Sequence, residues 1–299
     1  MKNSNQCSLL TKTPRILFPV DFSSRCVLAA RHVKAWTDGS NAALSTLHVV
    51  DPKALGYSPE RNDGSMYHDL ANLIAKRTAD LKHFSDHYFG ENVARHTILS
   101  GDAADQIEHF AKHENVDLIM LPRAHQSIVS RLLRDSLTAR ILHRSAASVW
   151  ITEHVEAADK LSINSILCAV HFERDLTLEA QNYRILQKVL TLAKAFQAKV
   201  TFLTVIDGRE EDTTRRPANA SLSSGIGPWL TRAHEQLGNG AEFLRQTGDV
   251  VSAITDAANR VAADLVVVGR TRPGTIGLGR QSRILKIDDA VHRPILSVW

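Results

Sequence analysis

The second half of this sequence repeats the first half, and no other feature constrains the fold as strongly. Asp102 aligns with Asp249 and Arg123 with Arg270, and the alignment runs without a gap at an offset of 147 residues in a chain of 299. Repeats that form solenoids are about 20–50 residues long. A repeat of half the chain therefore predicts a duplicated domain.

Composition and charge narrow the class of protein. The sequence is 43% hydrophobic and 23% charged, which is typical of a globular protein, and its net charge of +4 is small for this length. No apolar run approaches the roughly 20 residues of a membrane span, and the polar start lacks the apolar core of a signal peptide. We expect a cytoplasmic protein without a membrane partner.

One basic segment raises the question of nucleic-acid binding. It contains Arg131, Arg134, Arg140 and Arg144 with few acids nearby in sequence, but no aromatic residues interleave with these arginines to stack bases. The segment is better interpreted as a charged outer helix face, so a nucleic-acid partner is not expected.

The chain alternates short β-type runs with longer helical ones in both halves. The expected strands are Arg15–Val20, Ala43–Val50, Val93–Leu99, Val116–Leu121 and Ser148–Thr152, then Ile163–Val170, Lys199–Ile206, Ala241–Gln246, Asp264–Val268 and Ile295–Val298. The helices expected in the first half are Cys26–Trp36, Met66–Phe89, one capped by Asp102, and Leu132–His143. This alternation predicts α/β domains with parallel sheets.

The domain boundaries follow from this pattern. We expect a polar tail at residues 1–13, a first domain at 14–153, a charged linker at 154–161 and a second domain at 162–299.

The cysteines and histidines give no sign of a metal site. Cys7, Cys26 and Cys168 form no CxxC pair, and the last two lie in apolar patterns where burial is expected. His83/His87 and His109/His113 are spaced i, i+4, as two ligands of one metal can be. Both pairs point away from the apolar stripe of their helices, without a third ligand nearby, so we expect exposed histidines.

The sheet topology locates the expected ligand site. In an open parallel sheet, ligands bind outside the carboxyl ends of the strands, where the strand order reverses. The residues that follow the relevant strands are Asp21, Asp51 and the segment 122–136 in the first half, and His171, Asp207 and the segment 269–282 in the second.

Several segments resemble the universal stress protein family. They are Ile16 to Ser23, Leu47 to Val50 and Asp117 to Met120, then Ile166 to Val170, Asp264 to Gly269 and Arg293 to Val298. The resemblance covers nearly the whole chain twice and implies a tandem member. It implies two Rossmann-like (adenine nucleotide alpha hydrolase-like) domains, each a five-stranded parallel sheet flanked by helices. Because single-domain members tend to dimerise through the fifth strand, we expect the two halves to form an intramolecular pseudo-dimer.

The resemblance also implies a nucleotide site, which is degraded in the first half. In the nucleotide-binding branch, the fourth strand leads into a loop of pattern G-x2-G-x9-G-[ST], and an acid after the first strand and a residue of the second hold the ribose and adenine. Asp21, Val50 and Ser136 match the acid, the second-strand residue and the hydroxyl. The three glycines are replaced by Pro122, His125 and Asp135, so no phosphate cradle is expected here.

The second half keeps more of the loop and adds positive charge. Gly269 and Ser282 match the first glycine and the hydroxyl, Arg272 and Gln281 replace the other glycines, and His171 replaces the acid. The residues predicted to contact an anion here are Gly269, Arg270, Arg272, Gly279, Ser282, His171 and Asp207.

The sequence thus favours a non-catalytic stress-response protein that acts through protein partners or through a small anionic ligand in the second domain. No nucleophile with its base is recognisable, because Ser23 and Ser24 lack the glycine-flanked elbow of a catalytic serine. The alternative is an ATP-binding protein with slow hydrolysis in the second domain, and a third hypothesis is metal buffering by the histidine-rich first half. The identity of the partner, and further association into a homodimer, stay open.

Overall fold

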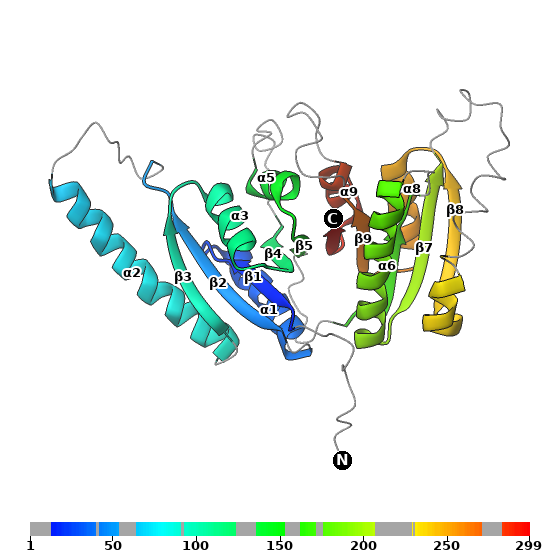
Figure 1. The fold of residues 1–299 in the computed structure, drawn as a ribbon, viewed down its shortest axis with the longest axis horizontal. Helices are drawn as coiled ribbons and strands as arrows, with labels where there is room; N and C mark the ends of the chain where they lie inside the picture. Colours follow the sequence, from blue (N-terminus) through cyan, green and yellow to red (C-terminus); the bar gives the residue numbers. More distant parts are fainter. Residues whose placement is uncertain are drawn as a thin grey trace, which may run out of the picture. The chain divides into compact units, whose positions relative to one another are not determined.

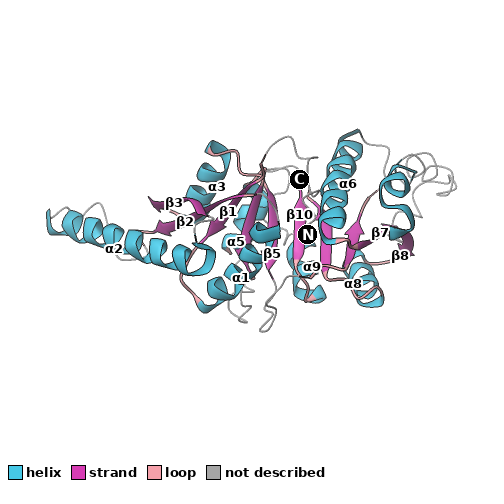
Figure 2. Cartoon of the chain, turned by 90° about the horizontal axis from the view of Figure 1, so that it is seen from below, coloured by secondary structure: helices cyan, strands magenta, loops and turns pink. Residues whose placement is uncertain are grey.

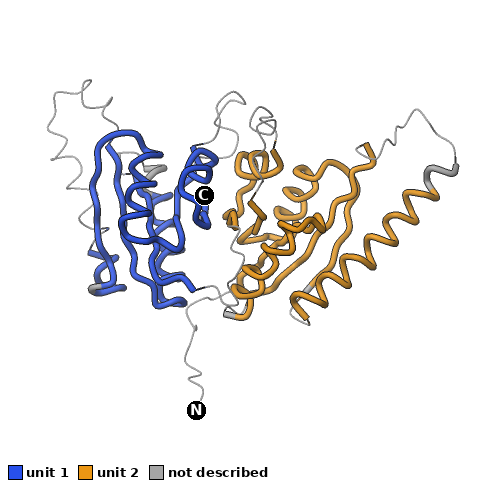
Figure 3. The backbone as a smooth tube through the Cα atoms, turned by 180° about the vertical axis from the view of Figure 1, so that it is seen from behind, with its two compact units in different colours: residues 1–6, 162–299 blue, residues 7–161 orange. Residues whose placement is uncertain are grey.

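The computed structural model divides the chain into two compact units between Leu161 and Ser162. The unit before this boundary, here called the first unit, is orange in Figure 3, and the unit after it, here called the second unit, is blue. The described residues are 13–39, 42–53, 64–90, 93–123, 136–152, 162–171, 176–206, 229, 231–270 and 283–299. The linker predicted at 154–161, and the predicted tail up to residue 12, lie outside them.

The first unit is an α/β domain (Figure 1). Its strands are β1 (Arg15–Pro19), β2 (Ala43–Val50), β3 (Val93–Ser100), β4 (Leu118–Pro122) and β5 (Ser148–Thr152). Its helices are α1 (Ser24–Gly39), α2 (Gly64–Phe89), α3 (Ala103–His113) and α5 (Leu137–Arg144). The strands lie in the order β3-β2-β1-β4-β5, and all of their pairings are parallel.

The core of the first unit fills both faces of this sheet. Ile16, Leu17 and Phe18 are consecutive in β1 and all are buried, although their side chains point alternately to opposite faces. Helices must therefore cover both faces, and Figure 2 shows the strands between helices. Trp150 of β5 is fully buried against Trp36 of α1, with the ring centroids 5.2 Å apart.

The second unit repeats the architecture. Its strands are β6 (Ser165–Ala169), β7 (Lys199–Ile206), β8 (Ala241–Thr247), β9 (Leu265–Gly269) and β10 (Ile295–Val298). Its helices are α6 (Leu176–Phe196), α8 (Val250–Arg260) and α9 (Arg283–Val291); residues 231–237 are also helical, and the short 3₁₀ helix η2 (Gly238–Gly240) follows them. The order is β8-β7-β6-β9-β10, again with parallel pairings.

The repeat extends to unusual backbone conformations. Gly101 and Gly248, which are 147 residues apart, have φ angles of 136° and 128°, a region that residues with a side chain rarely adopt. Asn115 and Ala262, at the same offset, both have left-handed φ angles, of 51° and 47°. The duplicated sequence thus folds into duplicated local structure, and the predicted parallel α/β fold is confirmed.

Several element boundaries differ from the prediction. The helix expected at Leu132–His143 is Leu137–Arg144, because Ser136 caps it, and the strand expected at Ile163–Val170 is Ser165–Ala169. The fourth strand begins at Leu118 instead of Val116, because the amide of Val116 donates to Ala111 O (2.8 Å) and so belongs to the turn that ends α3. Helix α1 begins before Cys26, because the Ser23 hydroxyl accepts a hydrogen bond from the Cys26 amide (3.2 Å) and caps the helix. The intramolecular pseudo-dimer concerns the placement of the two units and stays a prediction.

Candidate functional site

The reversal of strand order lies between β1 and β4 in the first unit and between β6 and β9 in the second. Since all pairings within a unit are parallel, the carboxyl ends of these strands meet at one edge of each sheet, here called the carboxyl edge. The predicted site residues that the structure describes are Asp21, Val50 and Ser136 in the first unit, and His171, Gly269 and Arg270 in the second. Asp207, Arg272, Gly279 and Ser282 lie outside the described residues.

Asp21 orders the turn between β1 and α1. Its Oδ1 accepts hydrogen bonds from the Ser23 amide (2.9 Å) and the Ser23 hydroxyl (2.6 Å), and the side chain is exposed. The carboxylate therefore lies at the predicted edge, and it already has a structural role as the acceptor that positions the helix cap.

An aromatic wall stands beside Asp21. The next residue, Phe22, has a left-handed φ of 59°, which is uncommon for a bulky side chain. Its ring packs on His48 of β2 at 4.7 Å between centroids, and the Arg77 guanidinium lies 5.4 Å from its centroid. His48 Nδ1 donates to Val20 O (2.7 Å), and burial lowers the pKa of this imidazole. This aromatic wall could not be predicted, because nothing in the sequence pattern signals a left-handed φ at Phe22.

Val50 and Ser136 lie on either side of the strand reversal. Val50 is buried at the end of β2, and its carbonyl accepts from the Gly101 amide (2.9 Å). The Ser136 hydroxyl accepts from the Ala139 amide (3.2 Å) and so caps α5. The amide that a phosphate would use at this helix start is thus bound to a side chain of the protein.

An ion-pair cluster joins α3 and α5 in the first unit. Asp102 caps α3 by accepting from the Asp105 amide (3.0 Å), and its two oxygens accept from Arg140 Nη1 and Nη2, both at 2.7 Å. Asp105 accepts from Arg140 (3.2 Å) and from Arg144. These hydrogen bonds, above all the one with Arg140, lower the pKa of Asp102 to about 2.

This cluster alters the interpretation of the basic segment. Arg140 and Arg144 were expected on a charged outer face with few acids nearby in sequence. The fold brings two acids from α3 against them, so their charges are neutralised within the unit. These ion pairs could not be predicted, because the spacing of residues in the sequence does not show that α3 lies against α5.

In the second unit, Gly269 ends β9 where α6 comes close. A Cβ atom at this position would lie 2.9 Å from Ile185 Cδ1 and 3.3 Å from atoms of Gln181, both on α6. The close approach of α6 therefore favours glycine at this position without any ligand. His171, where the family has an acid, is exposed, and its carbonyl accepts from Asn182 Nδ2 (2.7 Å).

Arg270 follows β9 directly and is only 5% exposed. Its amide donates to Val298 O (2.8 Å), and its carbonyl accepts from Gln181 Nε2. Burial lowers the pKa of its guanidinium to about 10, so the group stays protonated at neutral pH. Arg123, its counterpart in the first unit, is buried as well. The repeat alignment pairs these two arginines, and the structure shows that both are buried.

The predicted environments of the histidines and cysteines are confirmed where they are described. His83, His87, His109 and His113 are all exposed, and Cys26 and Cys168 are fully buried. Among the described residues, no three His, Cys, Asp or Glu side chains come together as a metal site. None of the described helices is long and apolar enough to cross a membrane.

Comparisons with known proteins show the family to which the chain belongs. The universal stress protein family matches residues 12–153 and again residues 165–284, and the chain belongs to this family as a tandem member. A universal stress protein of Methanocaldococcus jannaschii is 23% identical over 155 residues, which cover 46% of this chain and 94% of that protein. Single-domain relatives thus match one half of the chain.

Two solved structures match both halves together. A universal stress protein from Archaeoglobus fulgidus is 15% identical with a TM-score of 0.63, and each chain is 95% covered. A protein from Pseudomonas aeruginosa described as a universal stress protein is 13% identical with a TM-score of 0.66, covering 96% of this chain and 93% of that one. At these identities the likeness shows the fold alone.

Proposed function

We propose that this chain is a non-catalytic stress-response protein whose first domain has lost the nucleotide phosphate site and whose second domain holds a small anionic ligand. The observation that carries the proposal is that the polar groups at the carboxyl edge of the first unit already form hydrogen bonds with one another. Ser136 caps α5, Asp102 caps α3, and Arg140 joins the two helices through Asp102. A phosphate would have to compete with a carboxylate for the same guanidinium and with a hydroxyl for the same helix start.

The second carboxyl edge is the better place for an anion. Arg270 is positively charged and buried, and opposite charges attract more strongly in buried surroundings than in bulk water. In the sequence, Arg272 and Ser282 belong to the segment that follows Arg270, and both fit an anion by charge or by hydrogen bonding. A small anion is therefore the ligand class that best fits this edge.

The described nucleophilic groups support a non-catalytic role. The Cys26 thiol is buried, and desolvation raises its pKa to about 12, so it is not a thiolate at neutral pH. The Ser23 hydroxyl donates to Asp21 and also caps α1, so its lone pair is directed at a helix amide. Neither group is prepared for attack on a substrate.

The alternative is an ATP-binding second domain with slow hydrolysis. The retained Gly269 and Ser282 favour it. Against it stands the packing of Gly269 on α6, which accounts for that glycine without a phosphate.

The test is to purify the full chain from cells, denature it and identify the released small molecules by mass spectrometry. We expect close to one anionic compound per chain, lost in Arg272→Ala and Ser282→Ala and kept in the control Ser136→Ala. ATP or ADP at that stoichiometry would favour the alternative. An empty protein would contradict the ligand and leave action through protein partners.

A further inference from the structure

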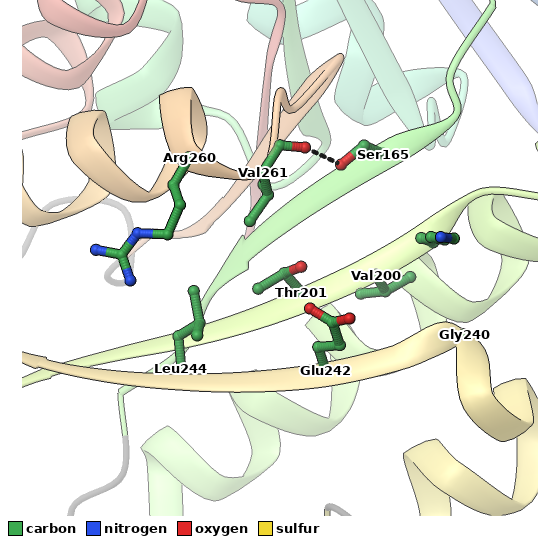
Figure 4. Close-up of a pocket in the computed structure, with 9 residues that line it drawn as sticks. Ser165, Val200, Thr201, Gly240, Glu242, Leu244, Arg260 and Val261 are labelled. Carbon is green, nitrogen blue, oxygen red and sulfur yellow. Dashed lines mark hydrogen bonds between the residues drawn. The ribbon is translucent and has the colours of Figure 1, made fainter.

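A cavity lies in the second unit at the edge of the sheet opposite the carboxyl edge, where β6, β7 and β8 begin and α8 ends (Figure 4). Its volume is about 360 Å³. It is lined by Ser165, Lys199, Val200, Thr201, Gly240, Glu242, Leu244, Arg260 and Val261. None of these residues belongs to the carboxyl edge. We call this space the amino-edge cavity.

The repeat explains why the cavity exists. In the first unit the equivalent space contains Arg95, which lies over the ring of Phe110 at 5.7 Å and donates to Glu114 Oε1 (2.6 Å). At the offset of 147 residues, Glu242 replaces Arg95 and Ala257 replaces Phe110. Two large side chains that pack on each other have thus become one shorter side chain and a methyl group.

A third replacement acts at the same place. In the first unit Arg15 donates to Glu114 O (2.6 Å), and in the second Ser165 donates to the equivalent Val261 O (3.0 Å). The helix carbonyl is satisfied in both units, but the serine occupies much less space than the arginine. Three substitutions therefore empty one site, while the hydrogen bond that supports the helix end is preserved.

The lining carries both signs of charge. Lys199 begins β7, Arg260 ends α8, and Glu242 lies on β8 in register with Thr201. Within the described parts of the chain, none of these three charged groups forms an ion pair. Figure 4 shows Arg260 extending from α8 on one side and Glu242 beside Thr201 on the other.

The guanidinium of Arg260 is held in place from behind. With the Gln246 amide oriented so that both of its atoms are satisfied, its oxygen accepts from Arg260 Nη2 (2.8 Å) and its nitrogen donates to Ala253 O (3.0 Å). A guanidinium has five N–H donors, so this single hydrogen bond leaves others for a ligand. Because Gln246 already restrains the Arg260 side chain, a ligand loses less free energy in ordering it.

We propose that the amino-edge cavity binds a small zwitterion of the amino-acid class. Its carboxylate is held by Arg260, its ammonium by Glu242, and a short apolar side chain lies against Leu244 and Val261. A simple anion would face Glu242 with a like charge, and a simple cation would face two. A neutral ligand would leave all three charges unmatched. The volume is at the small end for ligand sites, which suits one small molecule.

The experiment measures the melting temperature of the full chain with each common amino acid, one at a time, at millimolar concentration. We expect at least one amino acid to raise the melting temperature by mass action. The analogues of that amino acid that lack either the amino or the carboxyl group should bind about tenfold more weakly in calorimetry, because each has lost a charged hydrogen bond.

Variants assign the effect to the cavity. Glu242→Gln and Arg260→Gln should each weaken binding about tenfold, and the control Glu235→Gln, an exposed acid on the helical segment 231–237, should not. The inference is overturned if no amino acid stabilises the chain, or if the stabilisation persists in both variants.

Discussion

Replacing Gly269 with alanine tests whether this glycine serves packing. The added Cβ would lie 2.9 Å from Ile185 Cδ1, closer than Cβ atoms are found to other atoms. Ile185 is 1% exposed, so its methyl group can move only into occupied core. Gln181, at 3.3 Å, cannot withdraw without disturbing its hydrogen bond to the Arg270 carbonyl.

The magnitude follows from two opposing effects. Overpacking a well-filled site costs about 1–3 kcal/mol. Replacing glycine by alanine where φ permits it returns about 0.4–1 kcal/mol through the unfolded state. The difference between these two effects predicts a net destabilisation of about 0.5–2 kcal/mol.

Urea unfolding of the full chain, followed by circular dichroism and tryptophan fluorescence, measures the change. With a slope of about 2 kcal/mol per molar urea, the transition of the second domain should move down by about 0.3–1 M. Gly240→Ala is the matched control, because a Cβ atom added there would meet no atom within 4 Å and its φ is outside the left-handed region. If Gly269→Ala were as stable as Gly240→Ala, the packing explanation would be wrong.

Three other predictions concern single groups. The pKa of Asp102 in the folded protein is about 2, so its ion pair with Arg140 contributes stability above about pH 4 that is lost as the pH falls towards 2. Arg140→Gln should reduce this loss of stability at acid pH by at most about 1 kcal/mol, because Asp102 is partly exposed. Unfolding curves at acid pH measure the difference. Burial lowers the pKa of His48, so the neutral imidazole contributes its full stability above about pH 6.5 and less as the pH falls below that value. NMR titration should give His48 a pKa below that of a free histidine, and a normal pKa would refute its burial. In Cys7→Ser, the two buried thiols should react with a thiol reagent only after denaturation, and rapid labelling of the native protein would contradict the structure.

Much of the fold was predictable because its signals are local and appear twice. Runs such as Leu265 to Val268 contain consecutive apolar residues, as strands buried on both faces do, and Asp102 and Asp249 mark the helix starts that they do cap. The errors are at element ends. Val116 is apolar and fits the strand pattern, yet its amide is bound by the preceding helix turn.

The candidate site was less predictable, because its chemistry depends on contacts between distant segments. Ser136 matches the family hydroxyl in sequence, but only the structure shows that it caps a helix. Arg140 and Asp102 are 38 residues apart, and no spacing rule pairs them. The amino-edge cavity could have been suspected from the repeat alignment, since Ala257 opposite Phe110 marks lost volume, but the position of Arg260 required the fold.

The most direct test of the central claim is the number of ATP molecules that the full chain binds, measured by isothermal titration calorimetry with magnesium present. The account predicts that the first domain binds no ATP with a dissociation constant below about 1 mM, equivalent to about −4.1 kcal/mol, and that ATP is not hydrolysed. Two tight sites per chain, or one tight site that Ser136→Ala removes and Ser282→Ala leaves intact, would contradict it.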